Sequence, residues 1–354
     1  MSFEINRQNS KMSFWALNEA SPKLWHTLGY WNADFLRKTP CPCPTVLPGF
    51  SQYRRLTIYD IDSVCAFMKD HYGDSDWYID ADPSWLRTYF EDPSVIILGL
   101  FDENTLVATI LSTPISPGNT YIGSYTYFRT IRVIEGLCVH KQFRKKGIAA
   151  YMISAMDYET SRTEPCIHLW SRELPSKPVF STHLNAKTYG YIDCSVAKPT
   201  MNTTRMPWDE FSTLWENSSI HWVHTNPNSI VSTLPSNRRG GLTVWSVECG
   251  SEKIILIISD TKRKTKQDHI AIWEVIWVGK IESSLLVPST THPYCIESVA
   301  SQLKGLVFVM TEYGISSWNY PWRIGTSGIH AWYIYNYLPP TFGNCELHTV
   351  REEL

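Results

Sequence analysis

One stretch of the chain, residues 133–150, most strongly limits the possible folds. Val133–His140 is apolar enough to be a central strand. A helix is expected directly after it, because apolar residues then recur at helical spacing, at Ala149, Met152, Ile153 and Met156. The connection is short, basic and contains Gly147. The strand and the helix must therefore be neighbours in one α/β unit.

The connecting loop has the chemistry of an anion site. Arg144, Lys145 and Lys146 precede Gly147 where the helix begins. The first backbone N–H groups of a helix are unsatisfied and carry the positive end of its dipole. A glycine lets the backbone approach a diphosphate closely, and basic side chains add charge. The loop is a candidate diphosphate site, and the alternative is a basic turn that only caps a helix.

Composition excludes several classes of protein. The net charge of −2 gives no electrostatic reason for a nucleic-acid partner. Nine scattered cysteines and a polar first segment, Met1–Lys11, favour free thiols, a reducing compartment and a cytoplasmic location. Cys41-Pro-Cys43 lacks a second Cys/His pair at zinc spacing, so we expect no metal. No apolar run approaches the roughly 20 residues of a membrane span, and we expect a soluble monomer.

The rest of the chain alternates strands and helices in two blocks. The first block is expected to contain helices over Leu56–Tyr72 and Pro83–Phe90, then strands at Val95–Phe101, Leu106–Thr113 and Cys166–Trp170. The second is expected to contain strands at Leu242–Glu248, Lys253–Ser259, Ile270–Val278 and Trp332–Tyr337, and a helix at Ile296–Leu303. Lys262-Arg263-Lys264 is expected to be a solvated hairpin loop. This pattern predicts an α+β or α/β plan of two halves.

The residues around the basic loop resemble a known family. Arg144-Lys145-Lys146-Gly147-Ile148-Ala149 fits the Arg/Gln-x-x-Gly-x-Gly/Ala loop with which the GNAT acyltransferase superfamily binds the pyrophosphate of coenzyme A. Together with Glu135–Lys141, it resembles glycylpeptide N-tetradecanoyltransferase, the N-myristoyltransferase family. Further matches occur in family order at Phe14-Trp15, Leu47-Pro48-Gly49-Phe50, Leu106–Pro114, Leu174–Val179 and Trp332–Tyr337.

The resemblance implies a fold of two GNAT-like halves that share one continuous, saddle-shaped mixed sheet flanked by helices. Residues 1–50 would be an arm that contributes to the acyl-CoA site. Residues 51–200 would be the acyl-CoA-binding half, and residues 201–354 a diverged and shortened half on the peptide side. The implied reaction is direct attack of an N-terminal glycine amine on myristoyl-CoA, the co-substrate, without a prosthetic group.

The resemblance also implies roles for particular residues. Backbone amides of Gly136 and Leu137, freed by a strand bulge, would stabilise the oxyanion. The terminal carboxylate, on Leu354, would accept the amine proton. The implied coenzyme contacts are Ser13, Phe14, Trp15, Gly136, Leu137, Cys138, Val139, Arg144, Lys145, Lys146, Gly147, Ile148 and Ala149. The implied peptide contacts are Asp74, Asp76, Ser171 and Tyr333.

The acidic stretch Asp74–Asp82 resembles a mobile family loop that closes over a basic peptide, and its alternative is a solvated surface loop. Several departures concern the peptide side. Glu135-Gly136 replaces the family's Asn-Phe, and the tail after Gly343 is about two residues longer, so that Glu352 or Glu353 is an alternative base. Three hypotheses therefore stay open: an N-myristoyltransferase, a GNAT enzyme with another acyl donor such as acetyl-CoA, and a non-catalytic binding or assembly relative.

Overall fold

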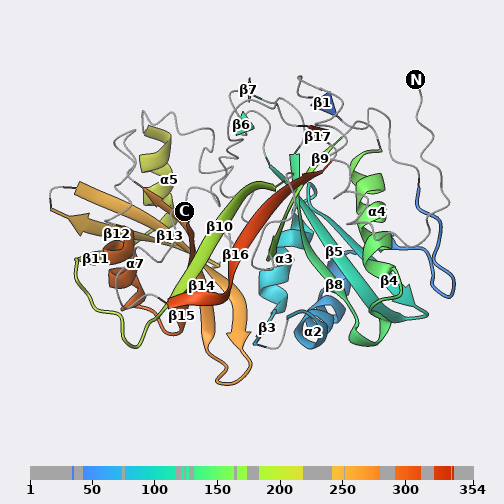
Figure 1. Cartoon of the computed structure of the whole chain (residues 1–354), viewed down its shortest axis with the longest axis horizontal. Coiled ribbons are helices and arrows are strands. Elements are labelled where there is room, and N and C mark those ends of the chain that lie inside the picture. The colour runs from blue at the N-terminus through green and yellow to red at the C-terminus, as the bar shows by residue number, and fades with distance from the viewer. Residues whose placement is uncertain are drawn as a thin grey trace.

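The computed structural model describes a chain built around one large mixed sheet (Figure 1). The residues it describes are 34–35, 43–73, 76–115, 121–122, 125–126, 131–162, 166–173, 183–217, 241–250, 252–279, 292–311, 323–335 and 337–338. Among these residues, no helix is both long and apolar enough to cross a bilayer. All cysteines in the same ranges are free thiols.

Two sets of strands form the sheet. The first set is β2 (Arg54–Arg55), β4 (Ile96–Asp102), β5 (Thr105–Ile115), β8 (Ile131–Val139), β9 (Ile167–Glu173) and β10 (His183–Asp193). The second is β11 (Thr203–Met206), β12 (Leu242–Cys249), β13 (Glu252–Thr265), β14 (Ala271–Gly279), β15 (Leu306–Thr311) and β16 (Arg323–Tyr335). Short β3 (Trp77–Ile79) pairs with β13, and two small sheets join β1 (Asp34–Phe35) to β17 (Tyr337–Leu338) and β6 (Tyr121–Ile122) to β7 (Tyr125–Thr126).

The strand order has an internal two-fold pattern. It runs β11-β12-β13-β14-β15-β10-β16-β9-β8-β5-β4-β2, and its centre lies between β10 and β16. Strands at the same distance on either side of this centre correspond to each other, for example β15 to β9 and β14 to β8. In each half a parallel pair follows three antiparallel strands: β8 with β9, and β14 with β15. The last strand of each half then crosses over, because β10 pairs with β15 and β16 pairs with β9. The expected mixed α/β fold of two halves in one sheet is confirmed.

Helices cover both faces of each half. In the first half, α4 (Ile148–Thr160) packs on one face of β4 and β5, while α2 (Ile61–His71) and α3 (Pro83–Glu91) pack on the other. In the second half, α7 (His292–Ala300) and α5 (Trp208–Asn217) cover opposite faces of β13. Two short 3-10 turns, η1 (Ile58–Asp60) and η2 (Lys141–Phe143), precede α2 and α4. The predicted boundary near residue 200 falls in the connection 194–202 and stays a prediction.

Three sequence expectations need correction. β13 continues to Thr265, so Lys262-Arg263-Lys264 belongs to a strand and the turn follows it. The cause is β3, which pairs with this part of β13, together with Asp80 and Asp82 just after β3, whose carboxylates lie within ion-pair distance of Lys264 and Lys262. Helix α7 begins at His292 and ends at Ala300, earlier than expected. Strands β10 and β15 were not expected at all.

The turn before α2 predicts a pH dependence of stability. The Asp60 carboxylate accepts hydrogen bonds from Arg54 Nη2, at 2.6 Å, and from the Thr57 N–H, at 2.8 Å. The bond from Arg54 is the main reason why the pKa of Asp60 falls to about 2. A depressed folded-state pKa gives stability that is present above the unfolded value and is lost as pH falls toward the folded value.

We therefore expect Asp60→Asn to cost about 1 kcal/mol of unfolding free energy at pH 7, after allowance for the half-exposed Arg54. The difference from wild type should shrink between pH 5 and pH 2. Urea unfolding midpoints measured across this range test it, with the exposed Asp62→Asn as the charge-matched control. A constant difference across the range would contradict the assignment.

Candidate active site

The centre of the candidate site is a bulge in β8. Thr109 on β5 pairs with Cys138 and Leu111 with Glu135, so Ile110 alone lies opposite Gly136 and Leu137. Gly136 has φ +60°, a left-handed conformation that glycine adopts readily and residues with a side chain disfavour. Its carbonyl accepts a 3.1 Å hydrogen bond from the Thr109 hydroxyl. A bulge leaves its extra residue out of the regular ladder, which is the arrangement that the predicted oxyanion site requires.

The bulge lies beside an opening in the sheet. β8 and β9 pair only from Ile131–Ile167 to Val133–Leu169, and β9 then continues against β16. Past Val133, none of the described strands pairs with the edge of β8 that faces β9. A strand edge of this kind is where an extended, amide-containing ligand can add to a sheet.

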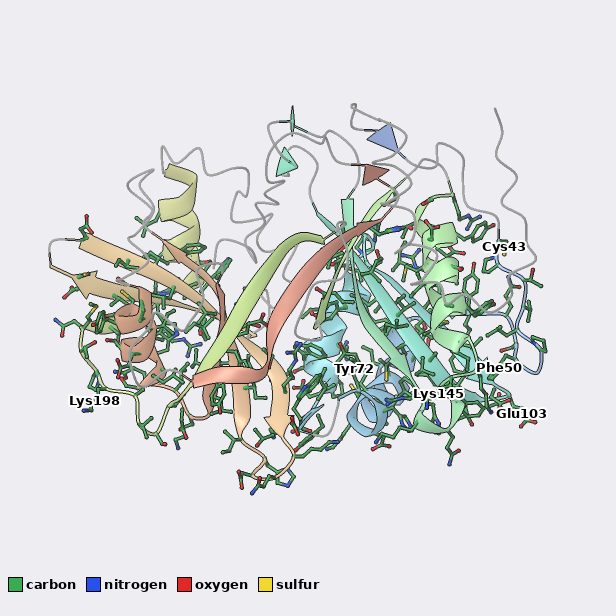
Figure 2. The ribbon with its side chains drawn as sticks, viewed as in Figure 1. Cys43, Phe50, Tyr72, Glu103, Lys145 and Lys198 are labelled. Carbon is green, nitrogen blue, oxygen red and sulfur yellow. The ribbon has the colours of Figure 1, made fainter. Side chains whose placement is uncertain are left out.

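The predicted anion loop follows this strand directly. Gly147 is the N-cap residue of α4 with φ +80°, and no side chain caps the helix. A Cβ placed on Gly147 would meet none of the described residues within 4 Å, so no described side chain crowds this glycine. Three lysines near Gly147 are exposed: Lys141, Lys145 and Lys146. Lys145 is labelled in Figure 2. The sequence thus builds an uncapped helix start that is surrounded by cations.

Arg144 has a structural task within the loop. Its Nε donates to the Val139 carbonyl at 3.1 Å, and its Nη2 donates to the His71 carbonyl at 2.9 Å. The guanidinium therefore ties the loop to the last turn of α2. Beneath it the rings of His71 and His140 lie 4.0 Å apart, and His140 Nδ1 accepts from the Gln142 N–H at 3.2 Å. Burial, followed by the His140 ring, lowers the pKa of His71, which favours its neutral form.

The remaining predicted coenzyme residues mostly pack inward. Ile148 is 1% exposed in the core under α4, and Leu137 and Val139 pack against the same core. Cys138 is buried on the α2 side, and burial raises the pKa of its thiol to about 12. A thiol that holds its proton so firmly is a poor nucleophile. These side chains position the backbone, and their atoms reach a ligand mainly through the main chain.

The predicted peptide residues fall in two places. β9 and β16 are adjacent, with Ser171 opposite Trp332 and Tyr333 opposite Trp170, so the predicted pair lies just past the point where β8 and β9 separate. Asp76 lies at the start of the strand β3 region, where its carbonyl accepts from the Lys266 N–H. The other predicted residues, Ser13, Phe14, Trp15, Asp74 and Leu354, lie outside the described residues.

Comparisons with known proteins agree with this geometry. Residues 56–174 match the family model of the acetyltransferase (GNAT) family. The whole fold is similar to Saccharomyces cerevisiae N-myristoyltransferase with bound myristoyl-CoA, with a TM-score of 0.62 and 11% identity over 86% of this chain and 84% of that chain. A second structure of that yeast enzyme with bound myristoyl-CoA gives a TM-score of 0.59 and 10% identity over 87% and 90% of the two chains. No curated protein matches the sequence. Residues 56–174 are therefore similar to the GNAT family, and the fold around them is similar to that of N-myristoyltransferase.

Two contacts of the candidate site are not predicted by the sequence. The Thr109 hydroxyl that braces Gly136 lies 27 residues away along the chain, and only strand pairing reveals it. The His71–His140 contact likewise depends on how α2 packs against the sheet. One signal was available for His140, which stands inside the matched string before the basic loop.

Proposed function

We propose that the protein is a coenzyme A-dependent acyltransferase that moves a myristoyl group from myristoyl-CoA to the N-terminal glycine amine of a peptide or protein. The observation that supports this best is the order in which three structural features follow one another along β8 and into α4. The bulge at Gly136–Leu137 lies beside the opening between β8 and β9, and the strand leads directly into the uncapped, cationic start of α4.

In the proposed reaction the diphosphate of the donor binds at Gly147 and the pantetheine chain lies along the open edge of β8. The thioester oxygen then points to the amides of Gly136 and Leu137. The neutral amine attacks the thioester carbon, and the carbonyl oxygen becomes an oxyanion held by these amides. The oxyanion then collapses, the C–S bond breaks, and the second proton of the nitrogen passes to the leaving sulfur, so that coenzyme A leaves as the thiol. No covalent intermediate on the chain is required, in keeping with the firmly protonated Cys138.

The N-terminal glycine is an ammonium in solution and must lose a proton before its nitrogen can attack. The family resemblance assigns this proton to the Leu354 carboxylate, with Glu352 or Glu353 as alternatives. Ser171 and Tyr333, on paired strands next to the opening, are the proposed peptide contacts together with Asp74 and Asp76.

A donor comparison tests the proposal. The purified protein is incubated with myristoyl-CoA or acetyl-CoA and with peptides that begin with Gly or with Ala, and released thiol is followed. We expect release only with myristoyl-CoA and a Gly-initiated peptide. Deletion of Glu353-Leu354 should then reduce turnover by at least about 100-fold, the scale of a lost general base. Unchanged turnover in the truncated chain would rule out the terminal carboxylate as the base.

A second candidate is a GNAT acetyltransferase, because the matched family model is that of acetyltransferases and spans residues 56–174. Thiol release with acetyl-CoA in the same experiment would select it. Tight binding of myristoyl-CoA without any release would instead select a non-catalytic relative.

A further inference from the structure

Residues Asp76–Asp82 connect the two halves at a second place, away from the central strands. We call this segment the strap. Its strand β3 pairs with the end of β13: Trp77 with Thr265, Tyr78 with Lys264, and Ile79 with Arg263. Two backbone bonds extend the pairing, from the Asp80 N–H to the Lys262 carbonyl at 2.7 Å and from the Lys266 N–H to the Asp76 carbonyl at 2.9 Å.

Ion pairs reinforce this contact across the halves. Asp80 binds Lys264 of β13 at 2.6 Å through one carboxylate oxygen and Lys69 of α2 at 3.2 Å through the other. Asp82 lies 3.4 Å from Lys262, which also binds Asp260 at 3.0 Å. The hydrogen bond with Lys264 is the main cause of the lowered pKa of Asp80, and the same bond raises the pKa of Lys264. Both shifts favour the charged pair.

The contact is polar, which sets it apart from the cores of the two halves. Ile79 is buried in the α2–α3 core, and that core contains first-half residues only. The cores around β13 contain none of the strap residues. Further contacts between the strap and β13 or the turn after it are also polar or cationic: Arg263 lies over the Trp77 ring at 4.7 Å, and Tyr78 Oη lies 3.0 Å from His269 Nδ1. Separation of β3 from β13 would therefore expose little apolar surface.

The strap also adjoins the candidate anion loop through α2. Lys69, which shares Asp80 with Lys264, lies in the last turn of that helix, and Arg144 of the loop binds the His71 carbonyl two residues later. Figure 2 shows Tyr72, the next residue, on the side of the first half that faces the hairpin of β13 and β14. The loop and the strap thus hold the same helix end.

We infer that the strap is an electrostatic latch between the halves: Lys262 and Lys264 close it, it opens without unfolding of either half, and its closure steadies the α2 end that supports the anion loop. Asp80 and Asp82 are thereby occupied by cations of the chain itself. Ligand binding at the loop and latch closure must favour each other, because coupling between two sites is reciprocal. This coupling rests on the proposed coenzyme A site, whereas the latch does not.

Hydrogen–deuterium exchange of the full chain without ligand tests the latch. Peptides that cover 76–82 and 262–266 should exchange about fivefold faster in 500 mM than in 20 mM NaCl, because salt screens exposed ion pairs. Lys264→Met or Asp80→Asn should give a similar increase at low salt. The matched control is Lys253→Met on the same strand, whose Glu210 partner lies 3.8 Å away in a half-exposed pair remote from the strap. Residues 254–258, at the centre of β13, are the internal reference.

The result that overturns the latch is exchange of the strap at the rate of residues 254–258, unaffected by salt and by Lys264→Met. Coenzyme A alone is the probe for the coupling. At saturation it should slow exchange of 76–82 at least about threefold in wild type, and Lys264→Met should weaken its binding by a similar factor. Bound coenzyme A that leaves the strap unchanged overturns the coupling. Absence of binding to wild type overturns the proposed function and with it the coupling, and the salt and Lys264→Met results then decide the latch.

Discussion

Replacement of Lys145 and Lys146 by glutamate should weaken the binding of coenzyme A by about 100-fold or more, measured by calorimetry at low ionic strength. Each substitution removes one attractive charge and adds a repulsive one beside the start of α4, and together they reverse the local field of the loop. A loss of about 3 kcal/mol corresponds to roughly this factor. Both side chains are exposed, so the fold should be unaffected.

The control for this charge reversal is Lys253→Glu, an exposed lysine of the second half whose change should leave coenzyme A affinity within about twofold of wild type. The affinity of wild type should also fall as salt rises, and that of the glutamate variant much less. If the double variant bound coenzyme A as tightly as wild type, the diphosphate site would have to be sought elsewhere than at Gly147.

Replacement of Gly305 by alanine should destabilise the protein by about 3–5 kcal/mol. Gly305 leads into β15 with φ +125°, and a Cβ there would lie 2.1 Å from the Ala271 carbonyl oxygen. The obstacle is backbone, at the point where β14 and β15 begin to pair, so no side-chain rotation relieves it. The Gly305 carbonyl also accepts from the Cys194 N–H at 2.9 Å, which joins the connection between the halves to the same point.

Gly250→Ala is the matched comparison, because Gly250 also has a positive φ, +62°, but a Cβ there would meet no atom of the described residues within 4 Å. Backbone strain alone should cost about 1–2 kcal/mol at this turn. Chemical denaturation of both variants separates strain from collision. Equal losses at the two glycines would mean that the backbone around Gly305 moves aside.

Much of the first half followed from the sequence because its signals are local. Helix α4 is predicted by residues at helical spacing and by Gly147, and β4 and β5 by apolar runs on either side of a tight turn. The second half is harder, because β13 continues through three consecutive basic residues that resemble a loop. Those residues form a strand because Asp80 and Asp82, about 180 residues earlier, provide their partners. Pairing at such distance along the chain has no local signature.

The same distinction applies to the candidate site. The loop residues and the Gly136–Leu137 position came from a contiguous string, and the structure has a bulge at that position. The roles proposed for these residues stay predictions. The sheet opening could not be foreseen, because it depends on β9 pairing beyond the end of its contact with β8 only with β16, a strand more than 150 residues further along the chain. Likewise, the residues that brace the loop, His71 and Thr109, are brought to it only by packing.

The exchange of the last strands between the halves has a consequence for how this protein can be divided. Since β10 pairs with β15 and with β16, and β16 also pairs with β9, the central part of the sheet consists of strands that alternate between the two blocks of sequence. A fragment that ended near residue 200 would leave both edges of β10 unpaired, and a fragment that began there would do the same for β16. Two such fragments supplied together would carry complementary edges. We therefore expect neither half to fold as a domain by itself. The whole chain, or two fragments that associate with each other, should be needed to form the sheet.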